Sequence, residues 1–235
     1  MSAGPLTNAG PFPDRRERLA RPLLIAFLAV CAADLVAVLA DSGTAHLVAK
    51  PLLMPLLAGY AAARRGPRLL IAALLCGWVG DVFLLADADL AFLLGMGGFA
   101  AGHLCYLTLF GRARGTLLPA ILYAAALAAF TALIWGGLPA GLRLPLVGYS
   151  LLLTAMACRS GVLGRYAAVG GALFLLSDAL IATGIADRPQ PPAPDFWVML
   201  TYVAAQLLLT LGALAPDARR PGAGPGAYRG RGISI

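Results

Sequence analysis

The chain has 235 residues, of which 60% are hydrophobic and only 12% are charged, and its formal net charge at neutral pH is +7. Soluble domains carry roughly 25% charged residues, so this composition excludes an ordinary soluble protein. The basic residues lie in short segments beside apolar stretches and form no single patch, so we expect no nucleic-acid partner.

Long apolar stretches predict eight transmembrane helices. Each is close to the roughly 20 residues that cross the hydrocarbon core, although the sixth is short. Their continuous Leu- and Ala-rich composition favours helices over membrane strands, which alternate in polarity. In chain order the spans are expected near residues 22–40, 46–63, 68–86, 90–111, 116–136, 144–158, 164–184 and 196–214. The expected fold is an all-α polytopic membrane bundle.

The apolar stretches leave no room for a second folded domain. We expect one membrane domain over residues 21–214, with disordered basic tails over 1–20 and 215–235 that are rich in Gly, Pro and Arg.

Charge alternates along the chain in a way that predicts topology. All but three of the 18 basic residues fall before span 1, in the connections after spans 2, 4 and 6, or after span 8. The exceptions are Lys50, Arg143 and Arg188. Because basic residues concentrate on the cytoplasmic side, we expect both termini in the cytoplasm and an inner-membrane location of the bacterial type.

The cysteines and histidines supply little metal-binding capacity. All four cysteines fall inside expected spans and no C-x-x-C occurs, so we interpret them as small buried apolar residues. The chain has only two histidines, whereas a zinc site needs three or more ligands. We expect neither a metal nor another cofactor.

Two aspartates lie within expected spans and are the strongest candidates for function. Asp81 occurs in CGWVGDVFLLA and Asp178 in GGALFLLSDALIA. A carboxylate at the centre of a membrane helix costs about 2.5–3.5 kcal/mol, so such residues usually serve a function. A structural bridge between an Asp and Lys50 is the alternative interpretation.

Other polar side chains recur near the same depth. His103 and Tyr106 share one helix face, and Tyr202 and Gln206 share another. Together with Lys50 and the aspartates, they predict a polar pocket between helices, toward the outer side of the membrane. The alternatives are that Lys50 extends to the outer surface, and that the other side chains only join helices. Asp34 is expected to line the pocket or to face the outer headgroups.

The spans around the two aspartates look alike. In each case a Gly-containing helix with an Asp is followed by an acidic connection and a helix that carries Tyr. This similarity suggests a two-fold repeat of four helices, although a shared Leu- and Ala-rich composition would also produce it.

Five segments, taken together and in order, resemble the lysoplasmalogenase family of YhhN-like membrane proteins. They are KPLLMPLL (50–57), GWVGDVFLL (77–85), FLLGMGGFAAGHLCYL (92–107), GALFLLSDALIA (171–182) and TYVAAQLLLTLG (201–212). The resemblance implies an eight-helix membrane hydrolase that cleaves the alkenyl (vinyl) ether bond of a lysoplasmalogen. The products would be a fatty aldehyde and a glycerophospho-ethanolamine or -choline.

The resemblance also implies which residues form the site. Asp81 and Asp178 are the expected catalytic pair, because two carboxyl groups in different surroundings can divide acid and base roles. The sequence does not assign which of them is the acid. The expected substrate-binding residues are Lys50, His103, Tyr106, Ser177, Tyr202 and Gln206. The expected partners are a lysophospholipid substrate and the surrounding membrane lipid, and the oligomeric state is left open.

Two other classes of function compete with this one. A metal-dependent membrane amidase or esterase is the nearest alternative enzyme. A transporter of small solutes or lipids would also use intramembrane Asp and Lys residues, a repeat and helices interrupted by Gly or Pro. A lipid-binding or assembly protein, in which the polar side chains only join helices, is a third interpretation.

Overall fold

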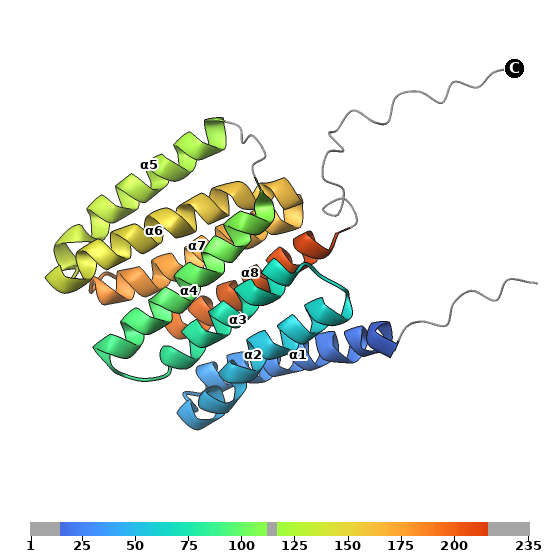
Figure 1. The fold of residues 1–235 in the computed structure, drawn as a ribbon. Helices are drawn as coiled ribbons and strands as arrows, with labels where there is room; N and C mark the ends of the chain where they lie inside the picture. Colours follow the sequence, from blue (N-terminus) through green and yellow to red (C-terminus); the bar gives the residue numbers. More distant parts are fainter. Residues whose placement is uncertain (1–14, 112–116, 216–235) are drawn as a thin grey trace, which may run out of the picture.

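The computed structural model describes residues 15–111 and 117–215. These residues form helices and contain no strand, which confirms the all-α class. The α-helices are α1 (Arg15–Leu39), α2 (Gly43–Ala63), α3 (Arg68–Phe83), α4 (Asp89–Phe110), α5 (Leu117–Ile134), α6 (Ala140–Ser160), α7 (Arg165–Ile185) and α8 (Pro194–Leu214), with the 3-10 helices η1 (Trp135–Gly137) and η2 (Gly161–Leu163) (Figure 1).

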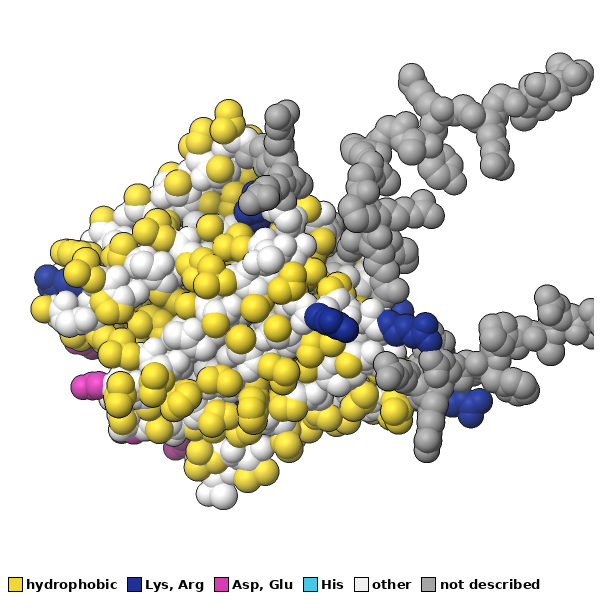
Figure 2. Space-filling view, in the orientation of Figure 1, with side chains coloured by type: hydrophobic (Ala, Val, Ile, Leu, Met, Phe, Trp, Pro, Cys, Tyr) yellow, Lys and Arg dark blue, Asp and Glu magenta, His cyan; other side chains and the backbone are white. Residues whose placement is uncertain are grey.

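The helices have the length and polarity of membrane spans. Seven of them are long and apolar enough to cross a bilayer, whereas α3, with 16 residues, is shorter. Figure 2 shows hydrophobic side chains covering the visible side of the bundle, with most of the charged side chains near its two ends. The protein is therefore an integral membrane protein.

Several helix ends differ from the predicted ends by three residues or more. Helix α2 begins at Gly43, before the predicted residue 46. Helix α1 begins at Arg15 and contains Pro22 in its interior. Residues 15–20 of the expected N-terminal tail are therefore helical. The rest of both expected tails, 1–14 and 216–235, lies outside the described residues. Helix α3 ends at Phe83, before the predicted residue 86.

Helix α6 begins at Ala140, earlier than the predicted residue 144, and so includes Arg143. The Arg143 guanidinium lies 5.3 Å from the centre of the Trp135 ring, and its Nε donates to the carbonyl of Leu138 at 3.1 Å. The charge is thus accommodated at the helix start, which is why the helix extends beyond the apolar run.

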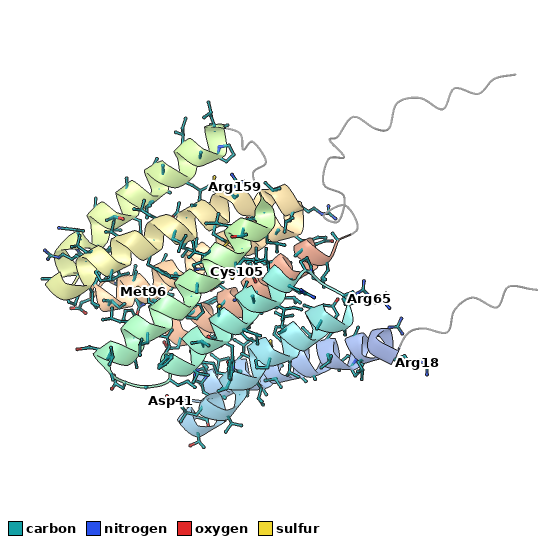
Figure 3. All side chains as sticks on the ribbon, viewed as in Figure 1. Arg18, Asp41, Arg65, Met96, Cys105 and Arg159 are labelled. Atoms are coloured by element: carbon teal, nitrogen blue, oxygen red, sulfur yellow. The ribbon has the colours of Figure 1, made fainter. Side chains whose placement is uncertain are left out.

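The two ends of the bundle carry opposite charges. We call the end with the connections 40–42, 84–88 and 186–193 the acidic end, because these connections carry Asp41, Asp87 and Asp187. The opposite, basic end holds the start of α1 and the end of α8 (Figure 1). Arg18, Arg65 and Arg159 lie toward the basic end and Asp41 toward the acidic end (Figure 3). Arg112 and Arg114, which were also used to predict topology, lie outside the described residues.

Glycines bring the backbones of α3 and α4 into close contact. A Cβ atom on Gly98 would lie 2.8 Å from the backbone nitrogen of Gly80 and 3.0 Å from the carbonyl oxygen of Cys76. Small residues of this kind let membrane helices approach closely. Helices α7 and α8 use the same device, since a Cβ on Gly212 would lie 2.7 Å from that of Ala167.

This packing gives a prediction with a neighbouring control. Gly98→Ala should destabilise the protein by about 1–3 kcal/mol, because the added methyl group meets backbone atoms that cannot move without separating α3 from α4. Gly97→Ala should be neutral or slightly stabilising, since no heavy atom lies within 4 Å of the added carbon. Thermal unfolding in detergent measures both, and equal melting temperatures for the two variants would contradict the packing argument.

Candidate active site

A cavity of about 310 Å³ lies among helices α2 to α8. This volume is at the lower end of the range for ligand pockets, about 300–1,000 Å³. Most of the lining is apolar and includes Met96 of α4, which is labelled in Figure 3. The polar side chains in the lining are Lys50, Asp81, Tyr149, Ser150, Thr154, Ser177, Asp178 and Tyr202. The two aspartates from α3 and α7 therefore border the same space.

Asp81 is held by a chain of hydrogen bonds from two other helices. Its side chain is 1% exposed, and its Oδ2 accepts the hydroxyl of Tyr202 at 2.7 Å. Gln206, one turn further along α8, lies with its Nε2 3.4 Å from the Tyr202 oxygen. The Gln206 Oε1 accepts the hydroxyl of Tyr106 from α4 at 2.7 Å. This buried chain fixes the orientation of the Asp81 carboxyl group.

Asp178 is held by a second chain, which runs through α6 to α4. Its Oδ2 accepts the hydroxyl of Tyr149 in a short hydrogen bond. The oxygen of Tyr149 lies 3.2 Å from Nε2 of His103, and Nδ1 of His103 has no partner in the described part of the chain. Because Tyr149 donates its one hydrogen to Asp178, its oxygen accepts from His103, which places the imidazole proton on Nε2.

The two carboxyl groups have matching arrangements. Each accepts one tyrosine hydroxyl on Oδ2, and among the described residues no donor reaches Oδ1 of either group. Two phenylalanines separate the two tyrosine chains. Phe174 packs edge-on against His103 at 4.8 Å and against Tyr202 at 5.5 Å between ring centres, and Phe99 adjoins both Phe174 and Tyr202. The tyrosines therefore fix the orientation of both carboxyl groups through Oδ2, and Oδ1 of each group is left for a ligand.

Lys50 brings a positive charge to the Asp81 side of the cavity. It is half-buried on α2, and its charge acts on both Asp81 and Asp34. Among the described carboxylates, none lies within 4 Å of its ammonium group, so it forms no closed ion pair there. The expected alternative of a structural Asp–Lys bridge is not what this geometry shows.

Prolines in α2 help to hold Lys50 in place. Pro55 has no N–H, so the carbonyl of Pro51 lacks its helical donor. The indole Nε1 of Trp78 on α3 donates to that carbonyl at 2.9 Å. This bond joins α2 to α3 beside Lys50 and Asp81.

Asp34 does not line the cavity, in contrast to one of its two predicted placements. Its side chain is 1% exposed, so it does not face the headgroups either. Its Oδ1 lies 2.8 Å from Nδ1 of His46, which is one turn before Lys50 on α2. The sequence did not reveal this pair, because it depends on the alignment of α1 with α2.

The remaining predicted residues divide into two groups. Ser177 lines the cavity, but its hydroxyl donates to the carbonyl of Val198 at 3.0 Å. His103, Tyr106 and Gln206 lie behind the lining, where they support the tyrosines that bind the aspartates.

Sequence reasoning missed Tyr149, the residue that binds Asp178. Ser150 and Thr154 follow Tyr149 in α6 and line the same cavity. This cluster of polar residues in an apolar helix was the sequence pattern that could have indicated Tyr149.

Within the described residues, no group of three or more His, Cys, Asp or Glu side chains is spaced to hold a metal ion.

These features define a polytopic membrane protein whose helices enclose a largely apolar cavity with two carboxyl groups. The model of the YhhN family matches residues 45–213, which include both hydrogen-bonded chains and Lys50. The chain therefore belongs to the YhhN family.

Curated relatives share this region. The chain is 40% identical over 149 residues to "Lysoplasmalogenase TMEM86B" of Homo sapiens, covering 63% of this chain and 64% of the relative. It is 42% identical over 156 residues to the protein of the same name in Sus scrofa, covering 65% and 64%. It is 32% identical over 171 residues to "Lysoplasmalogenase" of Mycobacterium bovis (strain ATCC BAA-935 / AF2122/97), covering 63% and 61%.

The alignments thus span somewhat less than two thirds of each of these relatives. No solved structure gives a significant match to the chain.

Proposed function

We propose that the protein is a membrane hydrolase that cleaves the alkenyl ether bond of lysoplasmalogen-type lysolipids. The names of the relatives support the reaction, and the cavity supplies suitable groups for it. The observation that carries the proposal is that Asp81 and Asp178 border one cavity whose other lining residues are mostly apolar. Such a space suits a substrate with a reactive polar link attached to a long hydrocarbon chain.

The surroundings of the two carboxyl groups favour different roles. Of the charges that act on Asp81, the cation of Lys50 is the largest and stabilises an ionised carboxylate, while the carboxyl groups of Asp34 and Asp178 oppose it. Among the described residues no cation acts on Asp178, which is held by the neutral hydroxyl of Tyr149. We assign Asp178 as the proton donor and Asp81 as the carboxylate that stabilises positive charge and activates water.

The reaction balances with these two groups and one water molecule. Asp178 protonates the outer alkenyl carbon, and the resulting oxocarbenium ion lies beside the Asp81 carboxylate. Water adds to the cation and gives one proton to Asp81. The product of this addition is a hemiacetal. The carbon–oxygen bond to glycerol then breaks as Asp81 protonates the glycerol oxygen and Asp178 takes the hydroxyl proton. A fatty aldehyde and a glycerophospho-headgroup leave, and both carboxyl groups return to their starting states.

The remaining site residues bind the substrate or position the two aspartates. Lys50 lies at the cavity wall with no carboxylate within 4 Å in the described chain, so it can also attract the phosphate of a lysophospholipid headgroup. Tyr202, Gln206 and Tyr106 orient Asp81, while Tyr149 and His103 orient Asp178. Ser177 contributes a polar edge to the lining.

The proposal includes a topology. All eight helices cross the membrane, with both termini in the cytoplasm and the acidic end outside, in a bacterial-type inner membrane. The charge difference between the ends supports this orientation. Helix α3 is about 24 Å long, and the turn residues Leu84 and Leu85 continue its apolar run toward the roughly 30 Å of a hydrocarbon core.

A repeat of four helices is part of the same proposal. The equivalent positions of Asp81 in α3 and Asp178 in α7 support it, as does the glycine packing of α3 on α4 and of α7 on α8. The tyrosines that bind the two carboxyl groups come from α8 and α6, and in this respect the halves differ.

The test is mass spectrometry of the purified protein with alkenyl, alkyl and acyl lysolipids that carry the same headgroup. We expect aldehyde from the alkenyl lipid alone, with a rate that strong chelators leave unchanged. Release of fatty acid from the acyl lipid, or loss of activity with a chelator, would instead support the amidase or esterase alternative. Uptake of unchanged lipid into vesicles without aldehyde would support a transporter.

Tyr149→Phe should lower kcat by about 10- to 100-fold with a smaller change in KM, because one hydrogen bond to the proton donor is lost. Tyr166→Phe is a matched control, since this tyrosine is 48% exposed and does not line the cavity. Aldehyde release measures both variants, and an unchanged kcat in Tyr149→Phe would remove this residue from the mechanism.

A further inference from the structure

Helix α5 is packed unusually loosely for a helix of this bundle. Ile134, its last residue, is the only buried residue of the helix. Leu117, Leu118 and Ile121, near its start, are 80%, 66% and 62% exposed. In Figure 1 this end of α5 diverges from α6, while the other end converges with it.

Buried contacts at the acidic end hold the last residues of α5 against α6 and α7. A small cluster of buried residues joins the end of α5 to α6 and α7 there: Ile134, Leu138, Leu146, Ala182 and Ala186. Helix α5 is therefore anchored at one end only, and the space between α5 and α6 widens away from this anchor.

A second hollow, of about 460 Å³, lies between α5 and α6, and its lining runs from Ala124 to Trp135 on the side of α5. Its lining is apolar apart from the Thr131 hydroxyl and the Trp135 indole N–H: Ala124, Leu127, Ala128, Thr131, Ala132, Trp135, Val147 and Leu151. Ala124, Ala128 and Ala132 follow one another at one-turn spacing, so α5 presents a strip of small side chains to the hollow. We call it the α5–α6 groove.

The groove adjoins the cavity that holds the aspartates. Leu127 lines both, and its neighbours Ala126 and Phe130 line the cavity. The carboxyl site and an apolar groove within the membrane-spanning part of the chain thus share one lining side chain. In a bilayer a groove of this kind is filled by hydrocarbon, because water finds almost no polar partner in it.

We infer that the α5–α6 groove binds the distal part of the substrate's hydrocarbon chain, with Leu127 at its entrance from the cavity. This inference rests on the proposed function, since it requires a reactive headgroup end at Asp81 and Asp178. The occupant is one hydrocarbon chain, because a lysolipid carries a single chain. Chain length is then selected along α5, away from the carboxyl groups.

The test compares octenyl, dodecenyl and hexadecenyl lysoplasmalogens as substrates of the full-length protein in nanodiscs. Ala128→Trp should lower kcat/KM for the hexadecenyl lipid by about tenfold or more, mainly through KM, and leave the octenyl lipid within about twofold, because Ala128 lines the groove beside Leu127 and does not line the cavity. The control is Leu122→Trp, which adds the same ring on α5 at a residue that is 60% exposed and lines neither space. It should leave all three substrates unchanged.

A second variant places the obstruction further along the groove. Ala132→Trp lies about one helical turn beyond Ala128, in the longer part of the groove that continues to Trp135, so it should spare the dodecenyl lipid and impair only the hexadecenyl lipid. An equal fall for all chain lengths in Ala128→Trp, or no fall for any, would overturn the inference. An equal fall accompanied by a change in oligomeric state would show that a second copy of the chain covers the groove.

The two proposals fail in different ways. If the native protein releases no aldehyde from any of the three lipids, the proposed function is wrong. If it releases aldehyde from all three and the variants do not discriminate between chain lengths, only the groove assignment is wrong.

Discussion

The Asp178→Asn variant should release aldehyde from an alkenyl lysolipid about 10²- to 10⁴-fold more slowly than the native protein, because an amide cannot donate the proton that starts the reaction. The effect should fall on kcat. Lipid binding should be largely retained, since the cavity lining is otherwise unchanged.

The substitution should not unfold the protein. The side-chain oxygen of asparagine can still accept the hydroxyl that Tyr149 donates to Asp178. The control is Asp87→Asn, which removes an exposed carboxylate from the connection between α3 and α4 and should retain full activity. Near-native turnover by Asp178→Asn, measured as aldehyde per folded protein, would reject its role as the acid.

Asp81→Asn should cause a loss of similar size for a different reason. Its carboxylate stabilises the developing cation and activates water, and removing such a charge from a dry site typically costs about 10²- to 10³-fold. Tyr202 can still donate to the asparagine oxygen, so the hydrogen-bonded chain through Gln206 should persist.

The effect of replacing Lys50 should depend on whether residue 81 carries a charge. Lys50→Met should lower the kcat of the native enzyme, because the cation that favours the ionised carboxylate is lost, but it should have little further effect on kcat in the Asp81→Asn background. The lost attraction for the phosphate should raise KM in both backgrounds. A fall in kcat of the same size in both backgrounds would contradict the coupling of Lys50 to Asp81.

Small carboxylic acids can distinguish the two roles. Formate added to Asp81→Ala should restore activity as the anion, so rescue should fade as the pH falls. In Asp178→Ala the protonated acid is required, so rescue should increase as the pH falls. The opposite pair of pH dependences would reverse the assignment of acid and carboxylate.

Much of the helical framework was predictable from the sequence because a bilayer imposes strong constraints. Apolar runs near the length of a membrane span predicted helices close to the observed α2, α4, α7 and α8. The start of α1 was not predictable, because Pro22 looks like a helix boundary and the helix continues through it. Helix α6 was predicted too short, because its first turns contain a charge that Trp135 and a carbonyl accommodate locally.

The site was predictable in part. Charged residues in apolar helices are costly, so Asp81 and Asp178 were prominent, and both border the same cavity. Tyr149 was missed because a tyrosine in a membrane helix is ordinary, and its importance comes from Asp178 on another helix. The link between Asp34 and His46 was missed for the same reason, since helix alignment decides it.

The central claim is that Asp81 and Asp178 act together on one substrate, and a double-mutant cycle tests it most directly. Aldehyde release from an alkenyl lysolipid should be measured for the native protein, Asp81→Asn, Asp178→Asn and the double variant. Groups that act as a unit are strongly non-additive, so the double variant should be about as slow as the slower single variant. Losses that multiply in the double variant, or near-native turnover in either single variant, would contradict the account.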